Sequence, residues 1–351
     1  MGYQGEKDIR VLRKIIIIVP RIDNTGPVKG ALALLNGLKN LNINCEIFSI
    51  YDQRRKCKNR RQSLISIIKK IYYLRSQQNN GAVLITYCLL PDLITSIFLK
   101  PQKSIVSIRG NLKKNYTDTY GAIGEFVAFF HHMIVRRFGY RTVLNLSMRR
   151  EVEKFGVTAV EIKNFIDEID YPKIPAKVEG GANFVFVFVG SMTNRKGVLL
   201  LLKTFYKLSK VHANLKLHLV GDGPEIYKVR KFVKDTNLSE LVIIHGQLDT
   251  PLEIVARSDY FVLPSLSEGT SRAAMEALYL GLPCIMRNVD SNSELIQSPE
   301  QGFLFDTDEE LFALMERAVT DGVSRRNKTR LPIEFSQIEC TKSYVNLVQA
   351  L

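Results

Sequence analysis

Paired cysteines are missing from this sequence. Its five cysteines are odd in number, are scattered, and form no C-x-x-C pair; they are Cys45, Cys57, Cys88, Cys284 and Cys340. A disulfide framework or a structural zinc site needs cysteines at close, regular spacing. The pattern argues against both and favours reduced thiols in a cytoplasmic protein.

Long apolar runs and low-complexity segments are also missing. A bilayer span needs about 20 consecutive apolar residues. The run "KIIIIVP" at Lys14–Pro20 is too short for that, and also too short for the core of a signal peptide. With 46% hydrophobic and 24% charged residues, the composition is that of a globular protein. A chain of 351 residues exceeds what one hydrophobic core usually supports, so two domains are expected.

Acidic residues are scarce in the first half of the chain. Residues 1–170 contain 28 Lys and Arg against 14 Asp and Glu, a net charge of +14, whereas the remaining residues contain 21 of each. This one-sided excess indicates a polyanionic partner for the first half, either an anionic membrane or a nucleic acid. No RNA-binding motif and no basic strand interleaved with aromatic residues is found, so charge alone favours nucleic acid.

Short apolar runs alternate with amphipathic stretches of helical period along the whole chain. Because these runs are continuously apolar, they predict strands buried on both faces, and hence parallel sheets covered by helices. The predicted fold class is α/β, with two doubly wound Rossmann-like domains. The expected strands lie at Lys14–Pro20, Asn44–Tyr51, Gly81–Tyr87, Lys103–Gly110, Arg141–Ser147, Asn183–Gly190, Leu215–Gly221, Leu241–Gly246, Asp259–Ser265 and Pro283–Met286.

The predicted domain boundary falls in "NFIDEIDYPKIPAKVEGGANF", Asn164–Phe184. Two prolines and a Gly-Gly pair interrupt the periodicity there, as is typical of a hinge. We therefore expect an N-terminal domain over residues 1–170 and a C-terminal domain over residues 171–330. Residues 331–351 predict a last helix, after Pro332, that returns to the N-terminal domain.

Ligands of open parallel sheets bind beyond the carboxyl ends of the strands. One loop at that edge runs into a predicted helix and reads "SEGTSRAAMEALYL". The free N–H groups of a helix start favour phosphate, Gly269 permits close approach, and Thr270 or Ser271 can cap. Glu268 and Glu276 flank this start. Because carboxylates repel phosphate, they are expected to bind sugar or ribose hydroxyls.

The loops "GSMTNRKG" and "GDGPE" follow two other predicted strands. Arg195 and Lys196 of the first loop can neutralise a diphosphate. Gly221 and Gly223 of the second are a weaker signal, because Gly-Asp-Gly-Pro is also a common turn. The loop lacks the G-x-G-x-x-G spacing of a nicotinamide or flavin site. Each feature has a plain alternative, since a helical glutamate is most often solvated and Arg-Lys-Gly is most often a charged turn.

From about Asn183 to Leu304 the chain resembles the retaining glycosyltransferases of family 4, the glycosyl transferases group 1. The similarity is carried by "FVGSMTNRKGVLLLLKTF", "LVGDGPE", "ARSDYFVLPSLSEGTSRAAMEALYLGLPCI" and "QGFLF", in that order. Its most specific element is the E-x7-E signature from Glu268 to Glu276. In the first half, "DNTGPVKGALALLNGLKN" resembles the family's N-terminal glycine loop and helix. The resemblance implies the GT-B fold, in which two Rossmann-like domains face each other across a cleft.

The resemblance also implies roles for particular residues. Lys196 would bind the donor diphosphate and Glu276 the ribose hydroxyls. Glu268 would contact the transferred sugar and the phosphates, together with the backbone of Gly269, Thr270 and Ser271.

The chain departs from the family pattern at two positions. Members often carry arginine directly after the glycine of the first loop, where this chain has Ser191. Either Arg195 takes its place or the diphosphate is bound more weakly. Of the glycine pair in the N-terminal loop only Gly26 is present, since Thr25 precedes it.

Retention of anomeric configuration is expected from the family, and no metal or cofactor is implied. A fixed cation and a helix N-terminus stabilise the departing diphosphate, so no separate base or nucleophile is named. "DTD" at Asp306–Asp308 is better explained as a capping box of Thr307 and Glu310 than as a metal site. The five histidines show no ligand spacing, and His218 and His245 are expected to pack in the core.

Two first-half segments have the character of membrane anchors. "QRRKCKNRRQSLISIIKKIYYL", Gln53–Leu74, places cations before an apolar helical stretch, and "EFVAFFHHMIVRRFGY", Glu125–Tyr140, is similar. Each is either an interfacial anchor on anionic lipid or a solvated loop and a helix that packs on the sheet. Arg109 and Gly110, in "SIRGNLKKNY", are candidates for contact with the acceptor or the donor phosphate, against an ordinary turn.

The sequence therefore predicts a hexosyltransferase-type, retaining, metal-independent glycosyltransferase. It would move a sugar from a nucleotide diphosphate sugar to a glycan or lipid-linked acceptor in cell-surface polysaccharide or glycolipid synthesis. It would be cytoplasmic and peripheral on the inner face of the cell membrane. The alternatives are a sugar-nucleotide epimerase, whose acid and base residues are not found, a basic nucleic-acid or membrane binder without transferase activity, and a catalytically silent module.

Overall fold

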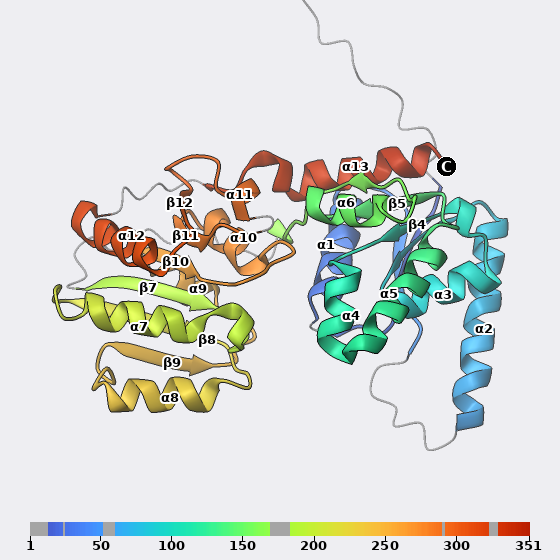
Figure 1. Cartoon of the computed structure of the whole chain (residues 1–351). Coiled ribbons are helices and arrows are strands. Elements are labelled where there is room, and N and C mark those ends of the chain that lie inside the picture. Colours follow the sequence, from blue (N-terminus) through green and yellow to red (C-terminus); the bar gives the residue numbers. More distant parts are fainter. Residues whose placement is uncertain (1–12, 24, 52–59, 169–182, 290–291, 323–328) are drawn as a thin grey trace, which may run out of the picture. The chain divides into compact units, whose positions relative to one another are not determined.

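The computed structural model describes residues 13–23, 25–51, 60–168, 183–289, 292–322 and 329–351. The chain divides into two units, Met1–Asp167 with Gln337–Leu351, and Glu168–Ser336. The sequence had placed the boundary at residue 170 and the end of the second domain at residue 330. Each unit is built on its own sheet (Figure 1).

The sheet of the first unit contains, in its described part, six parallel strands in the order β2-β1-β3-β4-β5-β6. Ile16 and Ile18 of β1 are buried against α2 and α3, while Ile15 and Ile17 are buried against α1 and α13. Burial on both faces explains why the run contains only Ile and Val. The strands are β1 (Ile15–Val19), β2 (Cys45–Ser49), β3 (Val83–Tyr87), β4 (Ser104–Ser107), β5 (Tyr140–Val143) and β6 (Val160–Glu161).

Helices cover both faces of this sheet. They are α1 (Gly26–Asn40), α2 (Arg60–Asn79), α3 (Leu89–Phe98), α4 (Leu112–Tyr120), α5 (Ala122–Val135), α6 (Leu146–Glu153) and α13 (Gln337–Gln349), with a short 3₁₀ turn at Pro101–Lys103.

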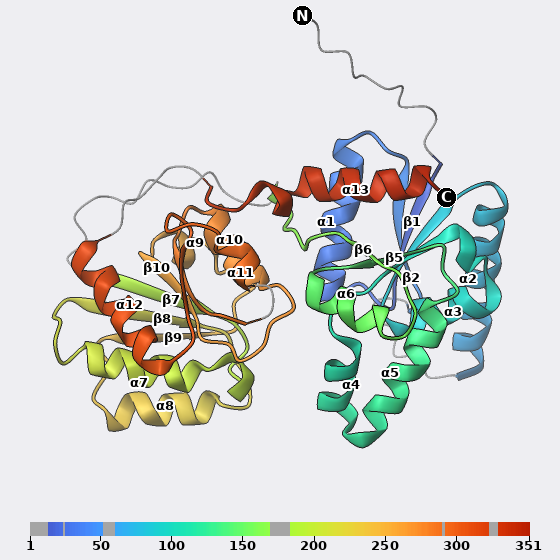
Figure 2. The same cartoon turned by 45° about the horizontal axis from the view of Figure 1, so that its top comes forward.

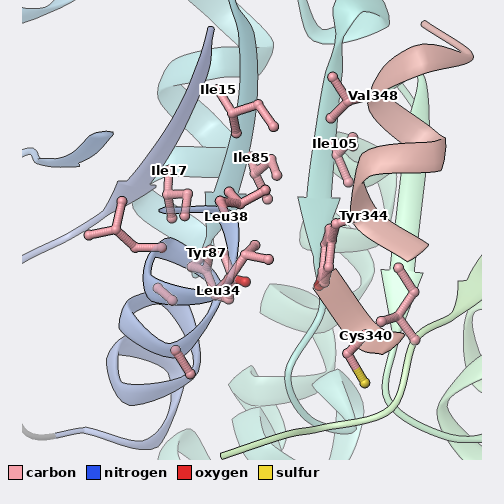
Figure 3. Close-up of a cluster of buried hydrophobic side chains, with 14 of the residues drawn as sticks. Ile15, Ile17, Leu34, Leu38, Ile85, Tyr87, Ile105, Cys340, Tyr344 and Val348 are labelled. Atoms are coloured by element: carbon pink, nitrogen blue, oxygen red, sulfur yellow. The ribbon is translucent and has the colours of Figure 1, made fainter. Parts of the chain in front are cut away.

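The last helix, α13, completes the core of the first unit. Its residues Cys340, Tyr344 and Val348 lie in one buried cluster with side chains of α1 and of the central strands (Figure 3). The buried Tyr344 hydroxyl lies 2.9 Å from the Ser107 hydroxyl and 3.2 Å from that of Thr142. Residues 337–351 thus join strands that are about two hundred positions away in the sequence.

The sheet of the second unit contains, within the described ranges, six parallel strands in the order β12-β11-β10-β7-β8-β9. They are β7 (Phe184–Val189), β8 (Leu215–Val220), β9 (Val242–Gly246), β10 (Tyr260–Leu263), β11 (Cys284–Arg287) and β12 (Gly302–Phe305). Every predicted strand is present. The sequence did not predict β6 or β12, which are short.

Helix α12 of the second unit begins at a recognisable capping signal. Thr307 and Glu310 form the predicted capping box at the start of α12, so the "DTD" prediction is confirmed. The helices are α7 (Val198–Leu208), α8 (Ile226–Asp235), α9 (Leu252–Ala256), α10 (Arg272–Tyr279), α11 (Asn292–Leu295) and α12 (Asp308–Asp321), with 3₁₀ turns at Asn194–Lys196 and Ile333–Phe335. No helix in the described ranges is long and apolar enough to cross a membrane.

Each strand order contains one point where the direction of winding reverses. It lies between β1 and β3 in the first unit and between β7 and β10 in the second. In doubly wound sheets the loops that follow the two strands at such a point diverge, and ligands bind there.

His218 and His245 do not pack in the core as predicted. They lie on the neighbouring strands β8 and β9, half-buried, with Nε2 of His245 and Nδ1 of His218 3.0 Å apart and the rings stacked. Burial lowers the pKa of both imidazoles, and for His218 the neighbouring His245 and Lys216 lower it further. One ring donates to the other, so the hydrogen bond is lost when both rings are protonated.

We expect the stability of the second unit to fall as the pH falls from roughly 7 to 5. The unfolded chain then binds protons that the folded histidine pair resists, which favours unfolding. Replacing both histidines with Gln should flatten this dependence. Thermal unfolding across that pH range checks the prediction, and an equal slope in the wild type and the double variant would contradict it.

Candidate functional site

The reversal point of the second unit holds a buried ion pair. Lys196 lies on the loop after β7 and Glu268 on the loop after β10, and these two strands are neighbours in the sheet. Nζ of Lys196 lies 2.6 Å from Oε1 of Glu268, with 13% and 7% of the two side chains exposed. The pair therefore brings together two residues that the sequence predicted separately.

Arg195 fixes the same two loops to each other. Its Nη1 donates to the Ser267 carbonyl at 2.6 Å and lies 3.8 Å from the Glu268 carboxylate. Leu266 donates its backbone N–H to the Arg195 carbonyl at 2.8 Å. A net positive charge thus surrounds a single buried carboxylate.

Gly197 is a residue that the sequence prediction missed. Its φ is +69°, and a Cβ there would lie 2.5 Å from the Pro264 carbonyl oxygen. Only glycine combines this conformation with so close an approach. The signal was available, because Gly197 directly follows the two cations and is the N-cap of α7.

The start of α10 has the predicted form. Ser271 is the N-cap, and its hydroxyl accepts from the Ala274 N–H at 3.3 Å. The Thr270 hydroxyl donates to the Gly269 carbonyl at 2.9 Å, so Thr270 does not cap. No atom lies within 4 Å of where a Cβ on Gly269 would be, so the space beside this backbone is open.

Glu276 lies one turn into α10 and is paired within its own helix. Its Oε1 accepts from Nε of Arg272 at 3.0 Å, with 14% of the glutamate side chain exposed. The sequence prediction gave Glu276 no cationic partner. Arg272 therefore holds the carboxylate in one rotamer.

The glycines of "GDGPE" have a packing role. A Cβ on Gly221, whose φ is +133°, would lie 1.9 Å from the Gly190 carbonyl oxygen, and one on Gly223 would lie 2.6 Å from that of Met192. The absence of side chains at both glycines therefore lets the backbone of the loop after β8 contact the backbone of the loop after β7. Ser191, which lies between Gly190 and Met192 in the sequence, is exposed.

Two buried hydroxyls at the reversal point were not predicted. Thr193 Oγ1 and Ser265 Oγ are buried, and neither has a hydrogen-bond partner among the described residues. Thr193 precedes the cations, and Ser265 comes two residues after β10 ends. Single hydroxyls give no sequence signal, so only the fold reveals them.

In the first unit, the side chain of Arg109 contacts Tyr87 and Asn164 of the same unit. Its guanidinium lies over the Tyr87 ring at 5.8 Å and donates to Asn164, while its Nη1 is buried without a partner among the described residues. Gly30 of α1 makes room, since a Cβ there would lie 2.6 Å from Nη2 of Arg109. One donor of Arg109 therefore remains for a ligand.

Gly110 and Gly26 differ in their surroundings. A Cβ on Gly110 would lie 2.3 Å from the amide nitrogen of Asn115, whereas nothing lies within 4 Å of one on Gly26. Gly26 begins α1 after Thr25, whose hydroxyl donates to Asp23 at 2.6 Å. Of the predicted glycines, Gly26 and Gly269 thus leave open space.

Cys88, directly after β3, is not an activated nucleophile. Burial first, and then the negative charges of Asp92 and Asp23, raise its pKa to about 12. The thiol therefore stays protonated near neutrality. Among the described residues, no group of three or more His, Cys, Asp or Glu side chains is placed to hold a metal ion.

Residues 172–330 match the family described as "Glycosyl transferases group 1". Over shorter stretches the chain is 32% identical to N-acetyl-alpha-D-glucosaminyl L-malate synthase of Bacillus anthracis, covering 41% of this chain and 39% of that protein. It is 31% identical to UDP-Gal:alpha-D-GlcNAc-diphosphoundecaprenol alpha-1,3-galactosyltransferase of Escherichia coli, covering 42% and 39%. The chain thus spans well under two thirds of the length of these curated relatives.

Solved structures match over nearly the whole chain. The lipopolysaccharide outer core galactosyltransferase WaaB has a TM-score of 0.68 at 16% identity, covering 96% of this chain and 99% of that one. Anabaena Alr3699/HepE in complex with UDP and glucose has a TM-score of 0.73 at 15% identity, covering 97% and 100%. Both are GT-B proteins, and the predicted fold is confirmed.

Substitution by alanine should affect stability differently at Gly221 and at Gly269. Gly221→Ala places a methyl group against a carbonyl oxygen at positive φ, so it should destabilise the protein by roughly 2 to 4 kcal/mol. Gly269→Ala enters open space and should change stability by less than about 0.5 kcal/mol. Chemical denaturation of both variants checks this, and an equal loss of stability in the two would contradict it.

Proposed function

We propose that this chain, whose residues 172–330 match the group 1 glycosyltransferases, transfers a sugar from a nucleoside diphosphate sugar to a glycan or lipid-linked acceptor. One observation carries the proposal, the buried pair of Lys196 and Glu268 at the reversal point of the sheet. It lies beside the start of α10, where free N–H groups attract phosphate. The curated relatives bear glycosyltransferase or synthase names, which does not favour the nucleic-acid or epimerase alternatives.

The proposed role of Lys196 is to bind the diphosphate while it stays paired. An ammonium group has three donors, and Glu268 occupies one of them. The remaining donors can reach phosphate oxygens without leaving the glutamate unpaired. Glu268 thereby fixes the position of the charge before the donor arrives, which lowers the cost of reorganisation.

Glu276 and Gly269 are proposed to hold the rest of the donor. The carboxylate of Glu276, held by Arg272, would accept from ribose hydroxyls. The open space beside Gly269 allows the phosphates to approach the N–H groups at the helix start. Solved structures of HepE contain UDP and UDP-glucose, which supports a UDP-sugar as the first donor to test.

The acceptor is proposed to bind the first unit, with Arg109 and Gly110 as candidate contacts. The remaining Nη1 donor of Arg109 can bind a hydroxyl or phosphate. One relative is named for a diphosphoundecaprenol acceptor and another for lipopolysaccharide. These names support a lipid-linked or glycan acceptor. We further propose that the chain works in a peripheral position on the inner face of the cell membrane.

The proposed reaction retains the anomeric configuration and uses no metal. The bond between the anomeric carbon and the diphosphate oxygen breaks, and the acceptor oxygen bonds to that carbon on the same face. The acceptor proton passes to the departing phosphate oxygen. Positive charge from Lys196 and the α10 start stabilises the diphosphate as negative charge develops on it.

Lys196→Met should lower kcat by roughly a hundredfold or more, because it removes a cation from the developing negative charge. Glu276→Ala should mainly raise the KM for the donor, by about tenfold. Lys203→Ala, an exposed cation on α7, is the matched control and should leave both constants unchanged. Steady-state transfer with a panel of UDP-, GDP- and ADP-sugars measures these effects. Full activity of Lys196→Met and Glu276→Ala would contradict the proposed site.

The configuration of the product provides a separate test. An α-linked donor sugar should give an α-linked product, read from the anomeric proton coupling by NMR. A chelator such as EDTA should leave the rate unchanged, since neutralisation of the diphosphate is assigned to side chains. An inverted product, or loss of activity that Mg²⁺ or Mn²⁺ restores, would refute this part of the mechanism.

A further inference from the structure

Helix α5 of the first unit has its large apolar side chains on the outside. The side chains of Ile123, Phe126, Phe129, Phe130 and Met133 are 70%, 72%, 52%, 48% and 44% exposed. We refer to these five as the α5 apolar face. The buried side of the same helix holds Gly124, Ala128, His131, His132, Ile134 and Val135.

This orientation is fixed by contacts on the buried side. A Cβ on Gly124 would lie 2.1 Å from the Tyr116 carbonyl oxygen, so only glycine lets α5 lie this close to α4. His131, buried, places Nε2 2.8 Å from Asp92 of α3 and Nδ1 2.9 Å from the Tyr116 hydroxyl of α4. Rotating α5 to bury its phenylalanines would break all three contacts. The outward orientation of this face is therefore fixed by the fold.

The hairpin of α4 and α5 reaches past the strands of the first unit's sheet, as Figure 2 shows. In the described part of the second unit the exposed large apolar side chains are Val211, Tyr227, Ile243, Leu266 and Ile333, at most one on any helix or strand. Five exposed apolar side chains on one helix are a different case, because exposed apolar clusters of this kind mark interaction sites. Helix α2 of the first unit also carries five, at Leu64, Ile65, Ile68, Tyr72 and Tyr73.

The charges of the first unit identify the kind of partner. Residues 1–170 carry a net charge of +14. The exposed Arg136 and Arg137 follow the α5 apolar face at its carboxyl end. Glu125, the one acidic residue in the sequence of α5, is paired with Lys113 at 2.9 Å. An apolar helix face in a cationic unit complements a bilayer with anionic head groups.

Other occupants fit less well. A second copy of the chain would bring two strongly positive units together, which costs free energy by mutual repulsion. A nucleic acid would offer phosphates to a face on which no cation lies between the phenylalanines. The bilayer satisfies both properties at once, since acyl chains accept the aromatic rings and head groups accept the arginines.

We propose that the α5 apolar face inserts into the interface of an anionic bilayer, with Arg136 and Arg137 at the head groups, and that α5 is a membrane-docking element of the first unit. The proposal extends the transferase assignment by naming the surface, and it stands on exposure and charge that do not depend on that assignment. Residues 52–59, including Arg54 and Arg55 of the predicted polybasic segment, lie outside the described residues. The test therefore addresses α5 itself.

The absence of tryptophan from the chain allows a direct test. Phe126→Trp in the full chain introduces a single reporter on the α5 apolar face. Its emission should shift to shorter wavelength, and its quenching by acrylamide should fall, when vesicles of phosphatidylglycerol and phosphatidylcholine are added. Tyr227→Trp, at a position 75% exposed on α8 of the second unit, is the control and should respond to neither. An unchanged emission of the tryptophan at 126 would overturn the proposal.

Co-sedimentation with the same vesicles provides a second measurement. The double variant Phe126→Gln with Phe130→Gln should bind at least roughly tenfold more weakly than the wild type, while Tyr227→Gln should bind equally well. The substituted side chains are exposed, so thermal unfolding should be unchanged. Equal binding by the double variant, or equal binding of the wild type to purely phosphatidylcholine vesicles, would contradict the proposal.

Sedimentation velocity without lipid tests whether a second copy of the chain, rather than a bilayer, covers the α5 apolar face. If the wild type self-associates and the double variant does not, a second copy covers the face and the bilayer proposal fails. All these measurements need no sugar donor. Failure here would leave the transferase proposal standing, and loss of transferase activity would leave the docking proposal standing.

Discussion

The ion pair between Lys196 and Glu268 is the interaction on which the candidate site depends. It joins the loops that follow β7 and β10, the two strands at which the winding of the second sheet reverses. Both side chains are largely shielded from solvent there. Removing Glu268 would leave Lys196 without this carboxylate, and removing Lys196 would leave Glu268 with the more distant cation of Arg195, at 3.8 Å. The pair thus determines where the positive charge of Lys196 lies, and the other features of the site are arranged around that position.

Close backbone contacts around the ion pair also hold these loops in place. Gly197 and Gly221 bring the loops after β7, β8 and β10 within contact of one another, at distances that no side chain would permit. Arg195 adds a second tie to the loop after β10. Gly269, in contrast to Gly197 and Gly221, lies next to open space. The difference between packed and open glycines separates the residues that build the site from those that a ligand can approach.

Much of the fold could be predicted from the sequence, because continuous Ile, Val and Phe runs have few structural outcomes other than buried parallel strands. The positions of Lys196 and Glu268 on loops after strands, and of Glu276 on the helix that follows, were also predictable, since these signals are local in sequence. The contact between Lys196 and Glu268 was not predictable from pattern alone, because it depends on β7 and β10 being neighbours although β8 and β9 lie between them in sequence. The outward orientation of the α5 phenylalanines was not predictable either, since Gly124 and His131 fix it through contacts with other helices.

The most direct test of this account is a double-mutant cycle of UDP binding, measured by calorimetry on the full chain with Lys196→Met, Glu268→Gln and the two combined. If Glu268 acts by positioning Lys196, the single changes should each weaken binding and their effects should not add, with a coupling free energy of about 1 kcal/mol or more. The combined variant should then bind UDP no more weakly than Lys196→Met alone. Strictly additive losses, or UDP binding that neither substitution changes, would contradict the account.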